Sequence, residues 1–346
     1  MTIMRFGLFC SAQANAGDLP PETGQGFRDY LDFNVEAEAL GFHASFLVEH
    51  HFTGWNQVSA TLMLLTCLAV RTTRLRVGSA VMVLPWHNPV LLAEQAATLD
   101  LVSGGRFDFG IGKGYRHSEF KGFQVLPEEA QARFDESVAV MTRAFTARER
   151  FSHRGRFWQF EDIVVEPPPA QKPHPPFWVA AASAASIAKA AARGFNLILD
   201  QYAAPEAIAE RIALYRAERI AHGHGFDPMQ VVVARQVYVA KDRADADAAL
   251  ARQAQYTGRT VSVSRAPGAT GGSHVLAYAD AAGGTEAHAL YGTPDEVAAG
   301  LAAVRRAGAE YVALTLSGGK EQLRRFANEV MPAFSGTVGS PALVGD

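Results

Sequence analysis

Residues 177–199 read FWVAAASAASIAKAAARGFNLIL and contain one complete structural unit. Phe177 to Ala181 is apolar and β-prone, Ala184 to Ala192 is an alanine-rich helical run, and Asn196 to Leu199 is again β-prone. Gly194 follows the helical run where a left-handed residue commonly ends a helix. The stretch therefore predicts a strand, a helix and a second strand parallel to the first.

The same alternation extends along most of the chain. One later helical segment begins after the capping residue Thr293 and ends at Gly308, which supports its limits. Eight strand–helix units in 346 residues predict an α/β fold, the (β/α)₈ TIM barrel with loop insertions. An open doubly wound sheet is the alternative, but no glycine-rich nucleotide fingerprint follows the first strand. The strand candidates are Arg5 to Phe9, Ala44 to Val48, Leu75 to Leu84, Phe107 to Gly112, Phe177 to Ala181, Asn196 to Leu199, Val231 to Val239 and Tyr311 to Leu316. The helix candidates include Ala130 to Thr146, Pro205 to Ala221 and Ala244 to Gln255.

Two segments interrupt this pattern. Arg156 to Val165 predicts a small extra hairpin. Thr257 to Leu290 is rich in Gly, Ala, Ser and Thr and predicts a mobile lid over the active site, with a disordered insertion as the alternative. We expect residues 1–335 to form one domain and residues 336–346 to form a C-terminal tail.

Composition excludes several classes of protein. The chain carries 32 Lys and Arg against 35 Asp and Glu, so it lacks the basic excess that binds nucleic acid. Cys10 and Cys67 cannot form a disulfide framework, and the N-terminus does not read as an export signal. No apolar run has the length of a membrane span. These features predict a soluble, cytoplasmic protein with no nucleic-acid or membrane partner.

The residues Glu49-His50-His51-Phe52 follow the second strand candidate directly. Reactive groups of a TIM barrel lie at the C-terminal ends of its strands, and three titratable side chains there are costly unless they bind or react. Successive residues of a strand point to opposite faces, so only one histidine faces the pocket and a metal site made from both is disfavoured. We favour a functional role for His50, whereas His51 fits a structural role equally well.

A candidate anion site follows the fifth strand candidate. Ser183 and Ser186 lie at the start of a helix, where free N–H groups and the helix dipole attract an anion. A simple serine cap is the alternative. Lys113 lies between glycines at the end of the fourth strand candidate and also suits a phosphate, whereas Arg133 fits a solvated surface charge equally well.

The chain resembles the bacterial luciferase-like flavin-dependent monooxygenase family over residues 4–240 and 290–332. The resemblance rests on Glu49 to Phe52, Val77 to Pro85, Ser103 to Gly114 and Gly292 to Pro294. It implies a TIM barrel that binds reduced FMN at its C-terminal mouth, where the flavin reacts with O₂ and the resulting flavin peroxide oxidises an organic substrate. It further implies a separate NAD(P)H:flavin reductase that supplies the reduced FMN, and a homodimer formed through helices near the second and third units.

The resemblance also assigns individual residues. His50 matches a catalytic acid/base, and Glu49, which we group with it as catalytic, matches a carboxylate beside the flavin pocket. Ala80 and Val81 match a non-proline cis peptide under the flavin ring. The expected phosphate ligands are Lys113, Arg133, Ser183 and Ser186, and Tyr115 completes the expected cofactor-binding set. No metal is expected.

Two departures from the luciferases argue against light emission. Gly112 replaces their reactive cysteine, and Ala182 replaces a Glu near the flavin, while Lys113 offers a point charge where the family has an arginine. Aromatic residues at the mouth, namely Phe52, Trp55, Trp86 and Tyr115, predict a small hydrophobic substrate such as an aldehyde, a ketone or a terpene-like molecule.

Two other functions stay open. One is hydride transfer with a deazaflavin, although relatives that use it tend to have Asp-His where this chain has Glu49-His50. The other is flavin binding without turnover. A dimer is also compatible with the apolar helix residues Leu62, Met63, Leu64, Leu65 and Leu68.

Overall fold

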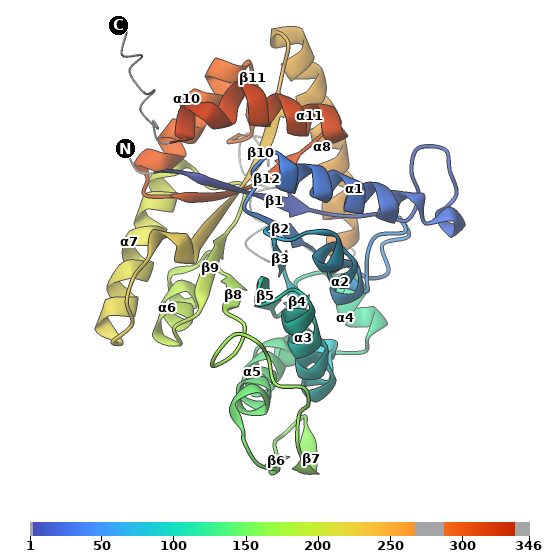
Figure 1. Cartoon of the computed structure of the whole chain (residues 1–346), viewed down its shortest axis with the longest axis vertical. Helices are drawn as coiled ribbons and strands as arrows, with labels where there is room; N and C mark the ends of the chain where they lie inside the picture. The colour runs from blue at the N-terminus through green and yellow to red at the C-terminus, as the bar shows by residue number, and fades with distance from the viewer. Residues whose placement is uncertain (1–2, 267–286, 336–346) are drawn as a thin grey trace, which may run out of the picture.

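The computed structural model of the chain describes residues 3–266 and 287–335. Eight parallel strands form a closed ring in the order β10, β12, β1, β2, β3, β5, β8 and β9, and β9 pairs with β10 to complete it. The register is continuous, as in the pairing of Phe6 with Val312 and of Ser45 with Val77. Helices surround the ring (Figure 1). The expected (β/α)₈ barrel is confirmed.

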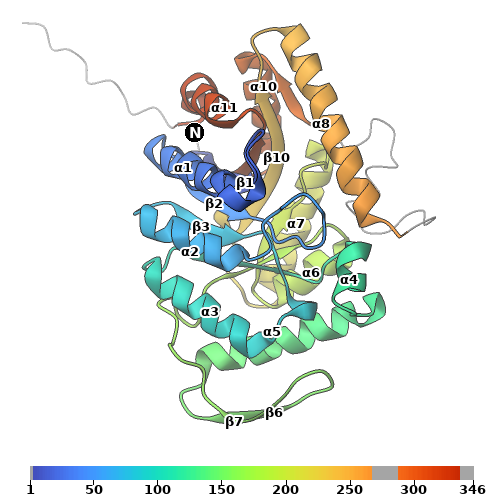
Figure 2. The same ribbon diagram turned by 90° about the vertical axis from the view of Figure 1, so that its right-hand side faces the viewer.

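The ring strands are β1 (Arg5–Cys10), β2 (Ala44–Leu47), β3 (Arg76–Ser79), β5 (Phe107–Gly112), β8 (Phe177–Ala180), β9 (Asn196–Leu199), β10 (Val231–Val239) and β12 (Tyr311–Leu316). Two short strands extend the sheet, β4 (Met82–Val83) beside β5 and β11 (Leu290–Gly292) beside β10. A separate antiparallel hairpin consists of β6 (Phe151–Arg154) and β7 (Gln159–Ile163). Both views show this hairpin projecting away from the barrel (Figures 1 and 2).

The helices are α1 (Gln25–Ala39), α2 (Thr61–Arg71), α3 (Pro89–Val102), α4 (His117–Gly122), α5 (Ala130–Thr146), α6 (Ala184–Ala192), α7 (Pro205–Ala221), α8 (Arg243–Ser264), α10 (Pro294–Arg306) and α11 (Gly319–Arg325). Shorter helical turns are η1 (Pro21–Thr23), η2 (Leu84–Trp86), η3 (Pro127–Glu129), η4 (Pro228–Gln230), η6 (Phe326–Val330) and η7 (Met331–Phe334). In the described part of the chain, no helix is both long and apolar enough to cross a membrane.

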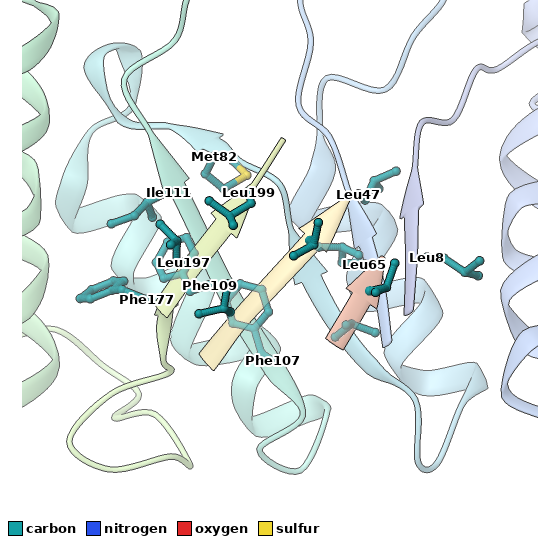
Figure 3. Close-up of a cluster of buried hydrophobic side chains, with 14 of the residues drawn as sticks. Leu8, Leu47, Leu65, Met82, Phe107, Phe109, Ile111, Phe177, Leu197 and Leu199 are labelled. Atoms are coloured by element: carbon teal, nitrogen blue, oxygen red, sulfur yellow. The ribbon is translucent and has the colours of Figure 1, made fainter. Parts of the chain in front are cut away.

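The barrel divides its apolar residues into two layers because strand side chains alternate. Residues that point outward, such as Leu47, Phe109 and Leu197, pack between the strands and the helices (Figure 3). Residues that point inward form a separate cluster that fills the barrel. The inner cluster consists of Ala44, Phe46, Trp178, Ile198, Val232, Tyr311 and Ala313. The interior is thus a packed core, and a ligand must bind above it.

Several expected limits change in the structure. The strand candidate Leu75 to Leu84 is split into β3 and β4, which are separated by a cis peptide bond between Ala80 and Val81. The hairpin begins earlier than expected, because Arg156 lies in its turn. There the carboxylate of Glu136 accepts hydrogen bonds from the backbone N–H groups of Arg156, Phe157 and Trp158.

The expected lid is partly wrong, because its first residues are helical. Helix α8 continues from Arg243 to Ser264, past the expected end at Gln255. Leu290 begins strand β11, which is too short to be recognised without its partner β10. Residues 267–286 lie outside the described part of the chain, so the lid stays a prediction there.

Candidate active site

The C-terminal ends of the barrel strands carry the residues that sequence analysis singled out. Phe9, Ala80 and Val81 are partly buried and pack on the inner apolar cluster. They form the floor of the site. His50, Lys113 and Ser183 each follow the C-terminal end of a strand, namely β2, β5 and β8.

His50 pairs with a carboxylate that sequence analysis missed. Its Nδ1 lies 3.0 Å from Oε1 of Glu119, and the same oxygen accepts the backbone N–H of His51 at 3.0 Å. Because a carboxylate only accepts hydrogen bonds, Nδ1 carries the proton in neutral His50. Its Nε2 is then free of that proton and can take or give one.

Burial sets the protonation state of His50. The side chains of His50 and Glu119 are only 14% and 2% exposed. Burial lowers the pKa of His50, the hydrogen bond that His50 donates to Glu119 raises it, the charge of Arg116 lowers it further, and the net direction is downward. Neutral imidazole, the form that accepts a proton, is therefore favoured at neutral pH.

Glu49 has the contacts of a positioning residue. Its carboxylate accepts the backbone N–H of Val83 at 2.7 Å and meets Nε2 of His51 at 2.7 Å and Nε2 of His87 at 2.6 Å. Trp86 Nε1 adds a longer contact of 3.4 Å. A carboxylate has about four acceptor sites, so these partners leave little capacity for a ligand. This differs from the catalytic role expected of Glu49.

The electrostatics of Glu49 agree with a positioning role. Burial raises its pKa, but the hydrogen bonds from His51 and His87, the charge of His87 and the N–H of Val83 together lower it to about 2. The ring of His51 also packs edge-on against Phe123 at 4.8 Å. The two histidines lie beyond the end of β2 and pair with different carboxylates, His50 with Glu119 and His51 with Glu49, and the contacts of His51 favour its structural role.

Small residues let strand β5 approach the Ala80–Val81 cis peptide, which the family resemblance implied. A Cβ on Gly110 would lie 1.7 Å from the backbone oxygen of Ser79, and one on Gly112 would lie 2.4 Å from Cγ2 of Val81. A cysteine at position 112 would therefore need Val81 to move. The packing of Val81 thus disfavours any side chain at position 112.

A pocket with several cations lies between the end of β5, helix α5 and helix α6, and it extends along α6 to its C-terminal end. Lys113, Ser186, Lys189 and Arg193 all line it. Lys113 Nζ lies 3.3 Å from Oε1 of Gln131, and Arg193 pairs with Asp135 at 2.7 Å. Its shape and charge suit a phosphate group.

The two serines at the start of α6 meet each other. Ser183 is the N-cap, its Oγ accepts the N–H of Ser186 at 3.3 Å, and the two hydroxyl oxygens are 2.9 Å apart. Ser183 itself is exposed at the mouth of the pocket that Ser186 lines. The structure thus brings the expected Lys113 and Ser186 together, with Ser183 as their neighbour.

Arg133 does not join this group. Its guanidinium pairs with Glu129 at 3.0 Å and lies 4.5 Å from the centre of the Phe157 ring. Gln131 and Asp135, four residues apart, share the helix face that lines the pocket, whereas Arg133 lies between them on another face. Arg133 therefore contacts the hairpin, and its expected place in the phosphate site is not supported.

Sequence analysis missed the cations of α6. Lys189 and Arg193 follow Ser186 at helical spacings of three and four residues, so all three share one face. This spacing was the signal that could have identified them. The sequence around Glu119 gives a weaker signal, because α4 has only six residues and no helical period can be read over so short a run.

Tyr115 and the expected mouth aromatics lie at the edge of the site. The ring centre of Tyr115 is 5.9 Å from the guanidinium carbon of Arg116. Trp86 stacks on Phe123 at 5.1 Å, and Phe52 lies 4.9 Å from the same ring with 59% of its surface exposed. Trp55 is half-buried on the loop that follows β2. An apolar wall therefore borders the His50 pair.

Comparison of the sequence with protein families and curated proteins gives consistent matches. The model of the luciferase-like monooxygenase family matches residues 4–311. The oxygenase component of the flavin-dependent trigonelline monooxygenase of Acinetobacter baylyi is 26% identical over 71% of this chain and 68% of that protein. The uncharacterized protein y4vJ of Sinorhizobium fredii is 33% identical over 50% of this chain and 49% of that protein. The chain spans about half the length of several curated relatives that it matches.

Solved structures match over nearly the whole chain. The monooxygenase RslO1 of Streptomyces bottropensis has a TM-score of 0.80 and 27% identity over 96% of this chain and 100% of that one. Another match is the oxygenating constituent of 3,6-diketocamphane monooxygenase of Pseudomonas putida, a type II Baeyer-Villiger monooxygenase in complex with FMN. It has a TM-score of 0.77 and 20% identity over 95% of this chain and 98% of that one. An F420-dependent secondary alcohol dehydrogenase has a TM-score of 0.76 and 18% identity over 96% and 99%. The last two structures share the fold of this chain.

Proposed function

Because the chain belongs to the luciferase-like monooxygenase family, we propose that it uses reduced FMN and O₂ to oxidise a small organic substrate. The observation that carries this proposal is the buried pair of His50 and Glu119 at the strand end, between the Ala80–Val81 floor and an apolar wall. A proton-transfer group with one nitrogen fixed and the other available is what an oxygenation reaction requires of the protein.

The residues present fit FMN. The pocket lined by Lys113, Ser186, Lys189 and Arg193 suits the phosphate, and the apolar, partly buried floor at Ala80 and Val81 suits a flat ring. Bound reduced FMN would supply the electrons that activate O₂. The chain would bind and orient the flavin, exclude water and move the proton at Nε2 of His50.

Glu119 and Glu49 act on the two histidines that follow β2. Glu119 holds the proton on Nδ1 of His50, so that Nε2 faces the reacting groups. Glu49 fixes His51, His87 and the backbone at Val83, and so holds the segment that follows the cis peptide. Both carboxylates are positioning residues, and His50 is the proposed catalytic residue.

We also propose a separate NAD(P)H:flavin reductase as the partner that supplies reduced FMN. A relative at 26% identity is named as an oxygenase component, which supports a two-component arrangement. The exposed aromatic wall at Phe52 supports a small hydrophobic substrate such as an aldehyde, a ketone or a terpene-like molecule.

The His50→Ala variant tests the proposal. Oxidation of a panel of aldehydes, ketones and terpenes by reduced FMN and O₂ should fall by at least ~100-fold, because the general acid/base is lost. FMN affinity should stay unchanged, since the phosphate pocket does not include His50. Turnover at the wild-type rate would exclude His50 as the catalytic residue.

Deazaflavin-dependent hydride transfer is the second candidate, because an F420-dependent dehydrogenase shares the fold. The two candidates differ in their need for oxygen. Consumption of O₂ with reduced FMN supports the monooxygenase, whereas substrate reduction or oxidation that needs F420 and no O₂ supports the alternative. Flavin binding without turnover of any substrate would favour a non-catalytic flavin-binding protein.

A further inference from the structure

A buried arginine at the site has a guanidinium without a full set of partners. Arg116 is only 2% exposed. Within residues 3–266 and 287–335, neither its Nε nor its Nη1 makes a hydrogen bond. Its ring contact with Tyr115, at 5.9 Å, leaves these donors unused. A buried charge is costly unless it is paired and hydrogen-bonded, so a bound anion is the natural partner.

Arg116 lies three residues before Glu119, whose carboxylate pairs with His50. It is the N-cap of α4, and its carbonyl oxygen accepts the N–H groups of Glu119 and Phe120. Its charge acts on His50, as part of the downward shift of the His50 pKa. On the other side it acts on Tyr256 of α8, where burial raises the pKa of the phenol and Arg116 opposes that shift.

Helices α4 and α8 pack against each other, and Figure 2 shows α4 next to the C-terminal end of α8. The guanidinium of Arg116 is therefore enclosed by α4, α8 and the His50 side of the barrel mouth. A group that pairs with Arg116 would lie close to His50, where a substrate must lie to react.

The anion that would pair with Arg116 is not the phosphate of FMN. Lys113, Lys189 and Arg193 already provide positive charge for a phosphate, and the pocket that they line does not include Arg116 or His50. The second anion must come from another ligand.

We propose that Arg116 binds a carboxylate of the substrate, so that the substrate is a small organic acid with an apolar body. A guanidinium presents a planar fork of N–H donors that matches the two oxygens of a carboxylate. The apolar wall formed by Trp86 and Phe123 contacts the rest of the molecule. This inference rests on the proposed function and narrows its substrate class.

Benzoate and benzamide test this inference, because they share a shape and differ in charge. Each compound is titrated into the FMN-saturated protein by calorimetry. Wild type should bind benzoate about tenfold to a hundredfold more tightly than benzamide, the range expected for hydrogen bonds to a charged group. Arg116→Gln should lose this preference, Arg116→Lys should keep part of it, and Arg148→Gln, at an exposed arginine, should keep all of it.

Several outcomes would overturn the inference. Equal binding of benzoate and benzamide by wild type would do so without any variant, even if Arg116→Gln does not fold. Weaker FMN binding by a folded Arg116→Gln protein, with benzoate preference retained, would assign the guanidinium to the flavin instead. Failure of wild type to bind FMN at all is a different result, because it would refute the proposed function whatever benzoate does.

Discussion

At the scale of single residues, the function depends on one hydrogen bond between His50 and Glu119. A carboxylate fixes the proton on Nδ1 and raises the pKa of the imidazole, in opposition to burial and Arg116. An amide in place of the carboxylate can both donate and accept, so it fixes the tautomer less strictly.

The Glu119→Gln variant should therefore be slow and have an altered pH profile. We expect the rate of substrate oxidation to fall about tenfold or more, and the acid limb of the pH profile to move to lower pH because the His50 pKa falls further. Steady-state kinetics across the pH range, with FMN affinity as the folding control, measure both. An unchanged acid limb would show that Glu119 does not set the protonation of His50.

Glu49 should contribute to stability in a pH-dependent way. Its pKa is lowered from 4.5 to about 2, so its contribution is present above about 4.5 and is lost as the pH falls toward 2. A shift of this size corresponds to roughly 3 kcal/mol. Glu49→Gln should lose about that free energy of unfolding at neutral pH and lose less in acid, as measured by urea denaturation. Equal losses at pH 7 and pH 3 would contradict this account.

The sequence identified some site residues and missed others for definite reasons. His50, Lys113 and Ser186 follow predicted strand ends, and the barrel fold brings strand ends together. Glu119 was missed because it belongs to a six-residue helix without a readable period, and Arg116 because it is the N-cap of that helix. Arg133 lies outside the pocket lining, because the face of a helix that meets a pocket depends on packing, which the sequence alone does not give.

At the scale of elements, the close approach of β5 to the segment after β3 shapes the floor of the site. Ser79 Oγ donates to the carbonyl of Gly110 at 2.8 Å. The backbone oxygen of Ser79 would lie 1.7 Å from a Cβ at Gly110, so there is no space for a side chain there. The clashing atoms belong to the backbone, so they cannot move aside as the end of a flexible side chain could.

Gly110→Ala should therefore reduce the free energy of unfolding by about 3 kcal/mol or more and weaken FMN binding. Gly258→Ala is the matched control, because within the described residues no atom outside the local helix backbone lies within 4 Å of its Cβ position in helix α8. It should stabilise the protein by about 0.5–1 kcal/mol. Thermal unfolding and FMN titration of both variants measure these effects. A neutral Gly110→Ala variant would show that the floor is not tightly packed.

Most elements could be predicted because their patterns are local. Helices α5, α6 and α7 have the expected limits, since a proline, a capping serine or a change in periodicity marks their ends. Strand β11 and the extension of α8 depend on contacts with distant residues. The break between β3 and β4 depends on the cis peptide at Ala80, which the family resemblance implied and local pattern did not.

At the scale of the whole molecule, dimerisation is a prediction that the structure leaves open. Of the apolar residues expected at an interface on α2, Leu62, Leu65 and Leu68 are buried within the chain. Met63 is 73% exposed, and Leu91 on the neighbouring α3 is 56% exposed. Light scattering should give twice the mass of the chain, and a monomer mass would contradict the prediction of a dimer.

The central claim concerns how the whole site controls the reaction of reduced flavin with oxygen. The most direct measurement mixes the anaerobic protein with photoreduced FMN, admits air, and follows the return of the oxidised-flavin absorbance. We predict that protein-bound FMN reoxidises more slowly than free FMN, that a substrate accelerates the return, and that His50→Ala abolishes this acceleration. Reoxidation at the rate of free FMN, with no effect of any substrate, would contradict the monooxygenase function.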